Sequence, residues 1–189
     1  MKKLFLTLVV FTAFTAGLSA QAFEKGNHGI NVGLGFGHMY YGGWGGAYYG
    51  SLPVISGSYE LGIVEVPMGS ELTGVVSVGG ILAFTGGRYA KWDDDNYWSW
   101  TSFTIAARGN YHFIFHDRFD PYAGVLMGFS IWTDKWHGDS SIQTSHSSSG
   151  GFEAGAYVGA RWFFTDAIAV YSEIGYLPAF FNVGVTFKL

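Results

Sequence analysis

Histidine, serine and carboxylate side chains occur close together between His146 and Glu153, a combination that can activate a nucleophile. In such sites a histidine takes the serine proton and a carboxylate orients the histidine. Here His146, Ser147 and Ser148 lie in a serine-rich stretch, SIQTSHSSSG, which predicts an external loop without a rigid supporting shell. The sequence therefore favours a protein that is not an enzyme over a hydrolase.

Metal chemistry has little support in the sequence. Asp93, Asp94 and Asp95 are adjacent and could present oxygen ligands to Ca²⁺, but they lack the spacing of a calcium-binding loop and are typical of a solvated loop. The histidines are scattered and there is no cysteine, so a zinc site and a disulfide framework are not expected. We expect no metal and no cofactor.

The third kind of chemistry is ion pairing inside the fold. Charged side chains are rare, and those within the predicted strands fall on one face: Glu60, Arg108, Glu153, Arg161, Glu173 and Lys188. Charges in a narrow interior persist when they are paired. We therefore predict a lumen charge network, with Glu153 nearer the outer mouth than the others. Two interpretations remain open, a largely plugged lumen or a narrow gated pore.

The segment Gly151 to Tyr176 indicates which elements position these charges. Every second residue from Phe152 to Trp162, and again from Ile168 to Tyr176, is unable to ionise, whereas the alternate positions hold all the charges. Successive side chains of a β-strand point to opposite faces. An apolar face opposite a thin, glycine-rich charged face predicts a lipid-facing wall with a polar interior. A soluble ligand-binding barrel would have the opposite polarity.

The same alternation predicts an all-β fold, an eight-stranded antiparallel up-and-down transmembrane β-barrel. The hairpin in Gly151 to Tyr176, which turns at Thr165 and Asp166, supplies two strands. The others are Gly29–Gly37, Pro53–Gly62, Leu72–Thr85, Trp100–Phe113, Pro121–Ile131 and Phe180–Leu189. Long external loops are expected over 38–51, 86–98 and 132–150, with short periplasmic turns between the other strands.

The N-terminus has the pattern of a secretory signal peptide. Lys2 and Lys3 precede an apolar run that is too short to span a membrane, and Ala20-Gln21-Ala22 predicts cleavage before Phe23. We expect a signal peptide over 1–22 and a barrel domain over 23–189. Aromatic residues near the predicted strand ends suggest interfacial girdles: Tyr40, Tyr41, Trp44, Trp92, Trp98, Trp100, Trp132, Trp136 and Trp162.

Four sequence stretches together resemble the small OmpA/OmpX or opacity-type outer-membrane β-barrel family: GARWFFTDAIAVYSEIGY, FDPYAGVLMGFS, the run from Arg108 to Tyr111, and NVGVTFKL. The resemblance implies a bacterial outer-membrane location, contact with membrane lipid and lipopolysaccharide, and an assembly signal at Phe187 and Leu189 that the barrel-insertion machinery reads. Leu189 stands where the family commonly ends in an aromatic residue.

The family resemblance implies a monomer with a structural or adhesin-like role and a possible external ligand at its loops. A porin-like channel is the alternative, and a lipid A-modifying enzyme is a further one. The formal net charge of −4 gives no indication of nucleic-acid binding.

Overall fold

The computed structural model describes residues 23–37, 48–68, 72–89, 96–114, 116–138, 146–176 and 178–189. The predicted signal peptide, Asp93 to Asp95, and the girdle residues Tyr40, Tyr41, Trp44 and Trp92 lie outside these ranges. The strands are β1 (His28–Phe36), β2 (Tyr48–Ser51), β3 (Val54–Met68), β4 (Leu72–Tyr89), β5 (Tyr97–Ile114), β6 (Phe119–His137), β7 (His146–Phe163), β8 (Ile168–Gly175) and β9 (Phe181–Lys188).

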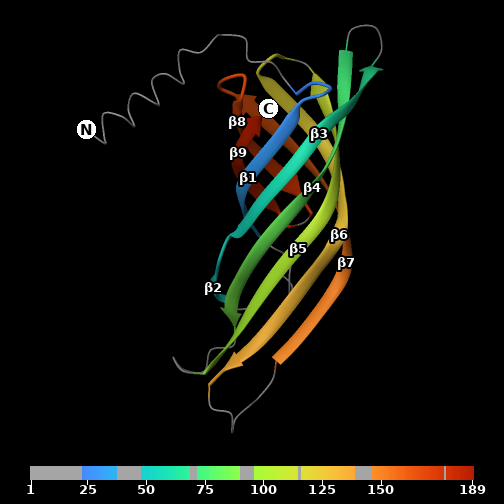
Figure 1. Cartoon of the computed structure of the whole chain (residues 1–189). Helices are drawn as coiled ribbons and strands as arrows, with labels where there is room; N and C mark the ends of the chain where they lie inside the picture. Colours follow the sequence, from blue (N-terminus) through green and yellow to red (C-terminus); the bar gives the residue numbers. More distant parts are fainter. Residues whose placement is uncertain are drawn as a thin grey trace, which may run out of the picture.

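The strands close into a ring of eight antiparallel strands, which confirms the predicted fold. Around the ring the order is β1, β3, β4, β5, β6, β7, β8 and β9, and β9 pairs again with β1 (Figure 1). Closure leaves no strand edge inside the ring, as a membrane requires of a sheet. The start of β1 and the chain end meet at one mouth, where the Leu189 amide donates to the His28 carbonyl oxygen at 2.9 Å.

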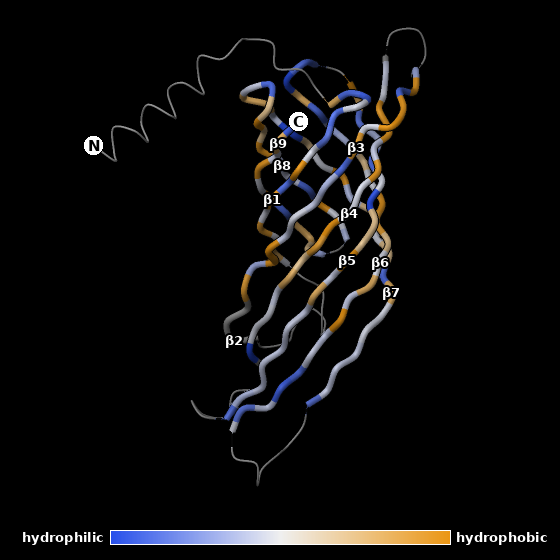
Figure 2. Tube along the Cα trace, in the orientation of Figure 1, coloured by the Kyte–Doolittle hydropathy of each residue, from blue (hydrophilic) through white to orange (hydrophobic). Residues whose placement is uncertain are grey.

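Polarity alternates across the wall as the sequence predicted. Outward residues such as Val125, Met127 and Phe129 are each more than half exposed, whereas Leu126 and Ser130, at alternate positions of the same strand, are buried in the lumen. Figure 2 shows apolar residues distributed along the ring, and paler or hydrophilic colours towards the far ends of β4 to β7. In β4, Val75 and Ile81 face the lumen, as their positions in the alternation predicted.

The strands differ greatly in length, and β4 to β7 project well beyond β1, β8 and β9 at the mouth opposite the termini (Figure 1). The prediction of loops over 38–51, 86–98 and 132–150 was therefore wrong in part. Residues 48–51 form β2, residues 86–89 and 97–98 belong to β4 and β5, and residues 132–137 and 146–150 belong to β6 and β7. The alternation of apolar and polar residues did not reveal these strand ends, because both faces of a sheet outside the bilayer can be polar.

Strand β2 extends the line of β3 within this projection. It pairs with the end of β4, and Leu52 and Pro53 separate it from β3. Pro53 has no amide hydrogen to donate, so a break at this point is expected. The break is held in place because the Leu52 amide donates to the Gly86 carbonyl oxygen at 2.8 Å and the Thr85 hydroxyl donates to the Leu52 carbonyl oxygen at 2.9 Å.

At the mouth that holds the termini, β3 continues into the predicted turn, whereas β4 begins at Leu72 as predicted. Strand β3 runs to Met68 rather than ending near Gly62, and Pro67 pairs in register with Thr73. Proline is tolerated there because β1 pairs with β3 only as far as Leu61, which leaves Pro67 on an edge strand. A register shift between Gly62 and Val64 marks where this hairpin leaves the ring.

Candidate functional site

The lumen holds, near the mouth that contains the termini, a buried cluster of four titratable side chains from four different strands. Arg161 of β7 donates to Glu60 of β3 and, at 3.4 Å, to Asp120 of β6. The His112 ring on β5 lies between the two carboxylates, with its Nδ1 atom 2.8 Å from Asp120 and its Nε2 atom 3.4 Å from Glu60. All four side chains are at most 1% exposed, so each charge depends on the others for compensation.

Neutral polar side chains also donate hydrogen bonds to the Glu60 carboxylate. Ser77 donates to one carboxylate oxygen at 3.0 Å and Asn110 donates to the same oxygen at 2.7 Å, while Asn31 approaches the other oxygen at 3.4 Å. A buried carboxylate is stable when its lone pairs are satisfied in this way. Glu60 is therefore the acceptor at which hydrogen bonds from β1, β4, β5 and β7 converge.

A second ion pair lies next to the first. Arg108 donates to Glu173 at 2.6 Å and to Ser58 at 3.2 Å, and the Tyr122 hydroxyl donates to the same Glu173 oxygen at 2.9 Å. The Arg108 guanidinium also lies over the Tyr157 ring, 4.8 Å from its centroid. Tyr122 contacts both ion pairs, because the Arg161 guanidinium lies 4.8 Å from the centroid of its ring.

Inward glycines allow these large side chains to lie across the lumen. A Cβ atom added to Gly124 would lie 2.5 Å from the Tyr157 ring, and one added to Gly159 would lie 2.6 Å from the Tyr122 ring. Only glycine permits an approach this close. Together with Leu126, the two tyrosines belong to a cluster of buried side chains at this level of the lumen.

Four of the six predicted lumen charges lie together, and the other two lie apart from them and from each other. The structure brings together Glu60, Arg108, Arg161 and Glu173, whereas Glu153 lies farther along β7 and accepts a hydrogen bond from Ser130 at 3.0 Å. Lys188 lies at the mouth that holds the termini, with its ammonium 4.9 Å from the centroid of the Phe163 ring. Phe187 and Leu189 are exposed at the same mouth, at 43% and 75%.

The sequence did not reveal two of the four members of the buried cluster formed by Glu60, His112, Asp120 and Arg161. Asp120 was assigned to a turn but lies in β6, which begins at Phe119, and its side chain is fully buried. His112 has the same alternation as Arg108, which predicts the inner face, but its sequence context indicates no role. The alternation of side chains along the strand could have revealed Asp120, because it lies two positions before the inward-facing Tyr122. In the structure it pairs in register with Arg161.

Phe23 is a third residue that the sequence did not reveal. It is completely buried in the lumen, stacks on the His112 ring with centroids 4.6 Å apart, and lies 5.4 Å from the Arg161 guanidinium. The segment after it is tied to β3, because the Gly26 amide donates to the Gly62 carbonyl oxygen at 2.9 Å and the Gly62 amide donates to Asn27 at 3.0 Å. Phe23 thus covers the charge cluster on the side of the termini.

We expect Phe23→Ala to lower the free energy of unfolding by about 3 kcal/mol, because a completely buried aromatic ring is lost from a packed site. Protein refolded without residues 1–22 avoids any effect of the substitution on processing. Urea unfolding from lipid vesicles measures the change, and Phe23→Leu should recover part of the loss. A change below about 1 kcal/mol would show that the ring does not pack as described.

Apolar residues pack on the opposite side of the charged cluster. Ala179, in the connection between β8 and β9, is 2% exposed and packs with Val54 and Ala83. A Cβ atom on Gly35 would come within 2.6 Å of the Ala179 side chain. Buried side chains therefore occur at three levels of the barrel, at Phe23, in the charged cluster and at this apolar contact.

The residues considered for nucleophilic catalysis do not meet. They lie along one extended strand, β7, in which His146 and Ser148 face outward and Ser147 and Glu153 face inward. Seven residues separate His146 from Glu153, about 23 Å along a strand. Within the described ranges, no group of three or more histidine or acidic side chains is arranged to hold a metal ion. No described helix is long and apolar enough to span a membrane.

Four tryptophans predicted to lie in interfacial girdles occupy another position. Trp98, Trp100, Trp132 and Trp136 lie in the projecting parts of β5 and β6, on the face that continues the lumen side. Trp100 and Trp136 are 7% and 8% exposed, and the rings of Trp98 and Trp136 are 5.6 Å apart. The girdle prediction was wrong for these residues, because they pack inside the projecting sheet. Trp162 faces outward at 46% exposure, as a girdle residue should.

Comparisons with known proteins agree with this geometry. The sequence matches the outer membrane protein beta-barrel domain family over residues 10–187. The fold resembles the crystal structure of Ail, the attachment invasion locus protein of Yersinia pestis, in complex with the heparin analogue sucrose octasulfate (TM-score 0.52, 12% identity), covering 87% of this chain and 99% of Ail. The N-terminal β-barrel domain of Pseudomonas aeruginosa OprF gives a TM-score of 0.46 at 14% identity, covering 88% and 100%.

No curated protein gives a significant match. At identities this low, the structural likeness establishes the fold alone. The family match spans nearly the whole chain, and the closed ring, the apolar outer wall and the polar lumen agree with it. The chain therefore belongs to the outer membrane protein beta-barrel domain family and is a β-barrel of the bacterial outer membrane.

Proposed function

We propose that this protein is a surface-interaction protein, in which a largely plugged barrel anchors an external sheet that binds partners outside the cell. The observation that carries the proposal is the projection of β4 to β7 beyond the rest of the ring (Figure 1). Family barrels place short turns and both termini in the periplasm, so the projecting ends lie outside the membrane. A purely structural wall protein has no need of an ordered external sheet.

Among the described strands, one edge of the projecting sheet has no neighbouring strand. Strand β7 pairs with β8 only from Tyr157 onward, so the backbone from His146 to Gly155 is paired with β6 alone. Soluble proteins commonly protect such edges with lysine, proline or a bulge. Here the first five residues of the edge are small or neutral polar apart from His146, and all five are exposed. An extended segment of a partner protein can add to this edge as a further strand.

The Ail structure supports the proposal by analogy. Ail is the attachment invasion locus protein of Yersinia pestis, and its crystal structure is a complex with the heparin analogue sucrose octasulfate. The shared fold makes an adhesive role a reasonable proposal for this chain. The partner is expected to differ, since only 12% of the residues are identical.

Shortening the projection should abolish attachment without affecting the barrel. Asp134 and Ser147 are opposite each other in the β6–β7 register, so residues 134–147 can be replaced by an Asn-Gly turn that joins Thr133 to Ser148. We expect cells producing this variant to attach to epithelial monolayers no better than cells that lack the protein. Heat-dependent gel mobility reports whether the barrel still folds.

Two outcomes would count against an adhesive role. If the shortened protein folds and its cells attach as well as those with the intact protein, the projecting hairpin is not the binding surface. If the intact protein gives no attachment either, and its deletion weakens the envelope, the protein has a structural role. Ser148→Lys offers a milder variant, because a charged edge residue hinders strand addition while the hairpin keeps its length.

The alternative function is a narrow gated pore. It would require Arg108 or Arg161 to exchange carboxylate partners, since both guanidiniums lie across the lumen. The buried side chains at three levels of the barrel favour a silent barrel, so we expect the refolded protein to give no conductance steps in a planar bilayer. Reproducible steps that change in Glu173→Gln protein would instead support the pore.

A further inference from the structure

Basic and polar side chains form a row across the outward face of the projecting sheet. The register pairs Arg88 of β4 with Ser99 of β5, Ser99 with Lys135 of β6, and Lys135 with His146 of β7. These four residues are neighbours on one face, and we call them the outer basic row. Arg88, Lys135 and His146 are exposed and Ser99 is half-buried. The sequence did not reveal the row, because its members are far apart in the chain.

The next rung of the sheet fixes Arg88 in place. Its guanidinium lies over the Tyr97 ring, 4.5 Å from the centroid, and that ring stacks on His137 at 4.7 Å with an interplanar angle of 12°. The Ser99 hydroxyl lies 2.8 Å from the His137 Nε2 atom. A stacked guanidinium loses less freedom on binding than a free one, and its fork of N–H groups matches the oxygens of a phosphate.

The surroundings of the row are free of opposing charge among the described residues. The rung on the membrane side consists of Gly86, Thr101, Thr133 and Ser148. Asp134 belongs to the other face of the sheet, as its pairing with Trp100 shows. The chain as a whole has a net charge of −4. The row is thus a local cationic site and not part of a generally basic surface.

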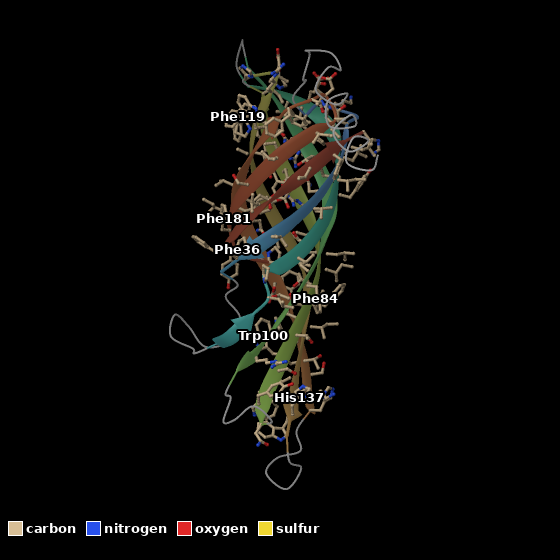
Figure 3. The ribbon with its side chains drawn as sticks, turned by 90° about the vertical axis from the view of Figure 1, so that its left-hand side faces the viewer. Phe36, Phe84, Trp100, Phe119, His137 and Phe181 are labelled. Atoms are coloured by element: carbon tan, nitrogen blue, oxygen red, sulfur yellow. The ribbon has the colours of Figure 1, made fainter. Side chains whose placement is uncertain are left out.

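The depth of the row relative to the membrane indicates its ligand. The last continuous apolar rung contains Phe84, Phe103 and Ile131, each at least 44% exposed. Arg88 is four residues beyond Phe84, about 13 Å along the strand and about 10 Å along the membrane normal at the usual tilt. Figure 3 shows the same progression from Phe84 to Trp100 and His137. The polar headgroup layer is about 5 to 8 Å deep on each side of the hydrocarbon, and the long Arg88 and Lys135 side chains can reach back to it from this height.

We propose that the outer basic row binds the phosphate-bearing headgroups of anionic outer-leaflet lipid. The row lies on the same face of the same strands as the lipid-contacting residues, so headgroups in the surrounding leaflet meet it directly. Arg88 and Lys135 supply charge, and Ser99 and His146 supply further hydrogen-bonding groups. The site orients the projecting sheet on the membrane and leaves the β7 edge available to partners.

The test uses purified full-length barrel in nanodiscs of neutral phospholipid doped with lipid A, either phosphorylated or enzymatically dephosphorylated. Native mass spectrometry measures how much lipid A each protein retains. We expect Arg88→Gln/Lys135→Gln to retain about tenfold less phosphorylated lipid A, because two cationic contacts are lost. Lys25→Gln/Arg118→Gln removes the same charge at the opposite mouth and should retain as much as the unsubstituted protein.

Three results would overturn the proposal. One is equal retention of phosphorylated and dephosphorylated lipid A by the unsubstituted protein. Another is an equal loss of lipid in the control variant, which would reflect net charge alone. A third is equal competition by soluble heparin and by phosphorylated lipid A for the same residues, which would identify the row as a soluble-polyanion site. Heat-dependent gel mobility verifies that every variant is folded before lipid retention is compared.

Discussion

Glu60→Gln is expected to destabilise the folded barrel by about 3 to 5 kcal/mol, the largest effect of any single lumen substitution. Glu60 is completely buried and accepts hydrogen bonds from Arg161, Ser77 and Asn110. A neutral amide removes the negative charge that compensates the Arg161 guanidinium, whose remaining carboxylate contact is the longer one to Asp120, at 3.4 Å. Urea unfolding from lipid vesicles, followed by tryptophan fluorescence and by gel mobility, measures the loss.

A double variant separates charge imbalance from loss of packing. Glu60→Leu/Arg161→Met removes both members of the pair and leaves Asp120 bonded to His112. Apolar replacement of a whole buried pair is often nearly neutral, so the double variant should be more stable than Glu60→Gln. If instead the stability loss of the double variant equals the sum of the losses of Glu60→Leu and Arg161→Met alone, Glu60 and Arg161 do not act as a pair. If Glu60→Gln costs less than about 1 kcal/mol, the side chain is not buried as described.

The second large effect is expected on the outer wall. Val125→Arg should cost about 2 to 4 kcal/mol, because Val125 is 56% exposed on the apolar face and would place a charge in the hydrocarbon layer. Thr133→Arg is the matched control, since Thr133 faces the same way on β6 but lies in the rung beyond the last continuous apolar one. The same urea titration in lipid vesicles measures both, and the control should change stability by less than about 0.5 kcal/mol.

The comparison between these two positions is informative in both directions. If both arginines are tolerated, the outer face at Val125 does not contact lipid. If both are costly, the hydrocarbon layer extends past the rung that contains Thr133, and the projecting sheet is shorter than proposed. Only a large loss at Val125 with a small one at Thr133 agrees with a bilayer that ends near Phe84, Phe103 and Ile131.

The sequence predicted the barrel because a lipid-facing wall allows almost no exceptions. An apolar residue is needed at nearly every outward position within the bilayer, so the alternation in β6 from Ala123 to Ile131 is unbroken. Outside the bilayer that constraint is absent. Thr133, Lys135 and His137 face outward as freely as Asp134 and Trp136 face inward, so the extension of the strand leaves no periodic signal. The same lack of constraint misplaced the four tryptophans of the projecting sheet.

The lumen was predictable in kind but not in detail. The alternation along each strand places Glu60, Arg108, Arg161 and Glu173 on the inner face. Which of them form ion pairs across the lumen depends on the stagger between strands, and the alternation does not indicate that stagger. Asp120 was missed because it lies one residue after the start of β6, where turn and strand have the same composition. Phe23 was missed because it belongs to no strand and enters the lumen from the end of the ring.

The central claim is that β6 crosses a bilayer with its odd-numbered residues in lipid and then leaves it as an external sheet. Because the chain contains no cysteine, single cysteines carrying a nitroxide can be placed at 125, 126, 127, 130, 133 and 135. Spin-label accessibility in lipid vesicles should show that oxygen reaches 125 and 127 but not 126 and 130, and that a water-soluble relaxation agent reaches 133 and 135. Accessibility of 125 and 127 to the water-soluble agent, or equal values at odd and even positions, would contradict the account.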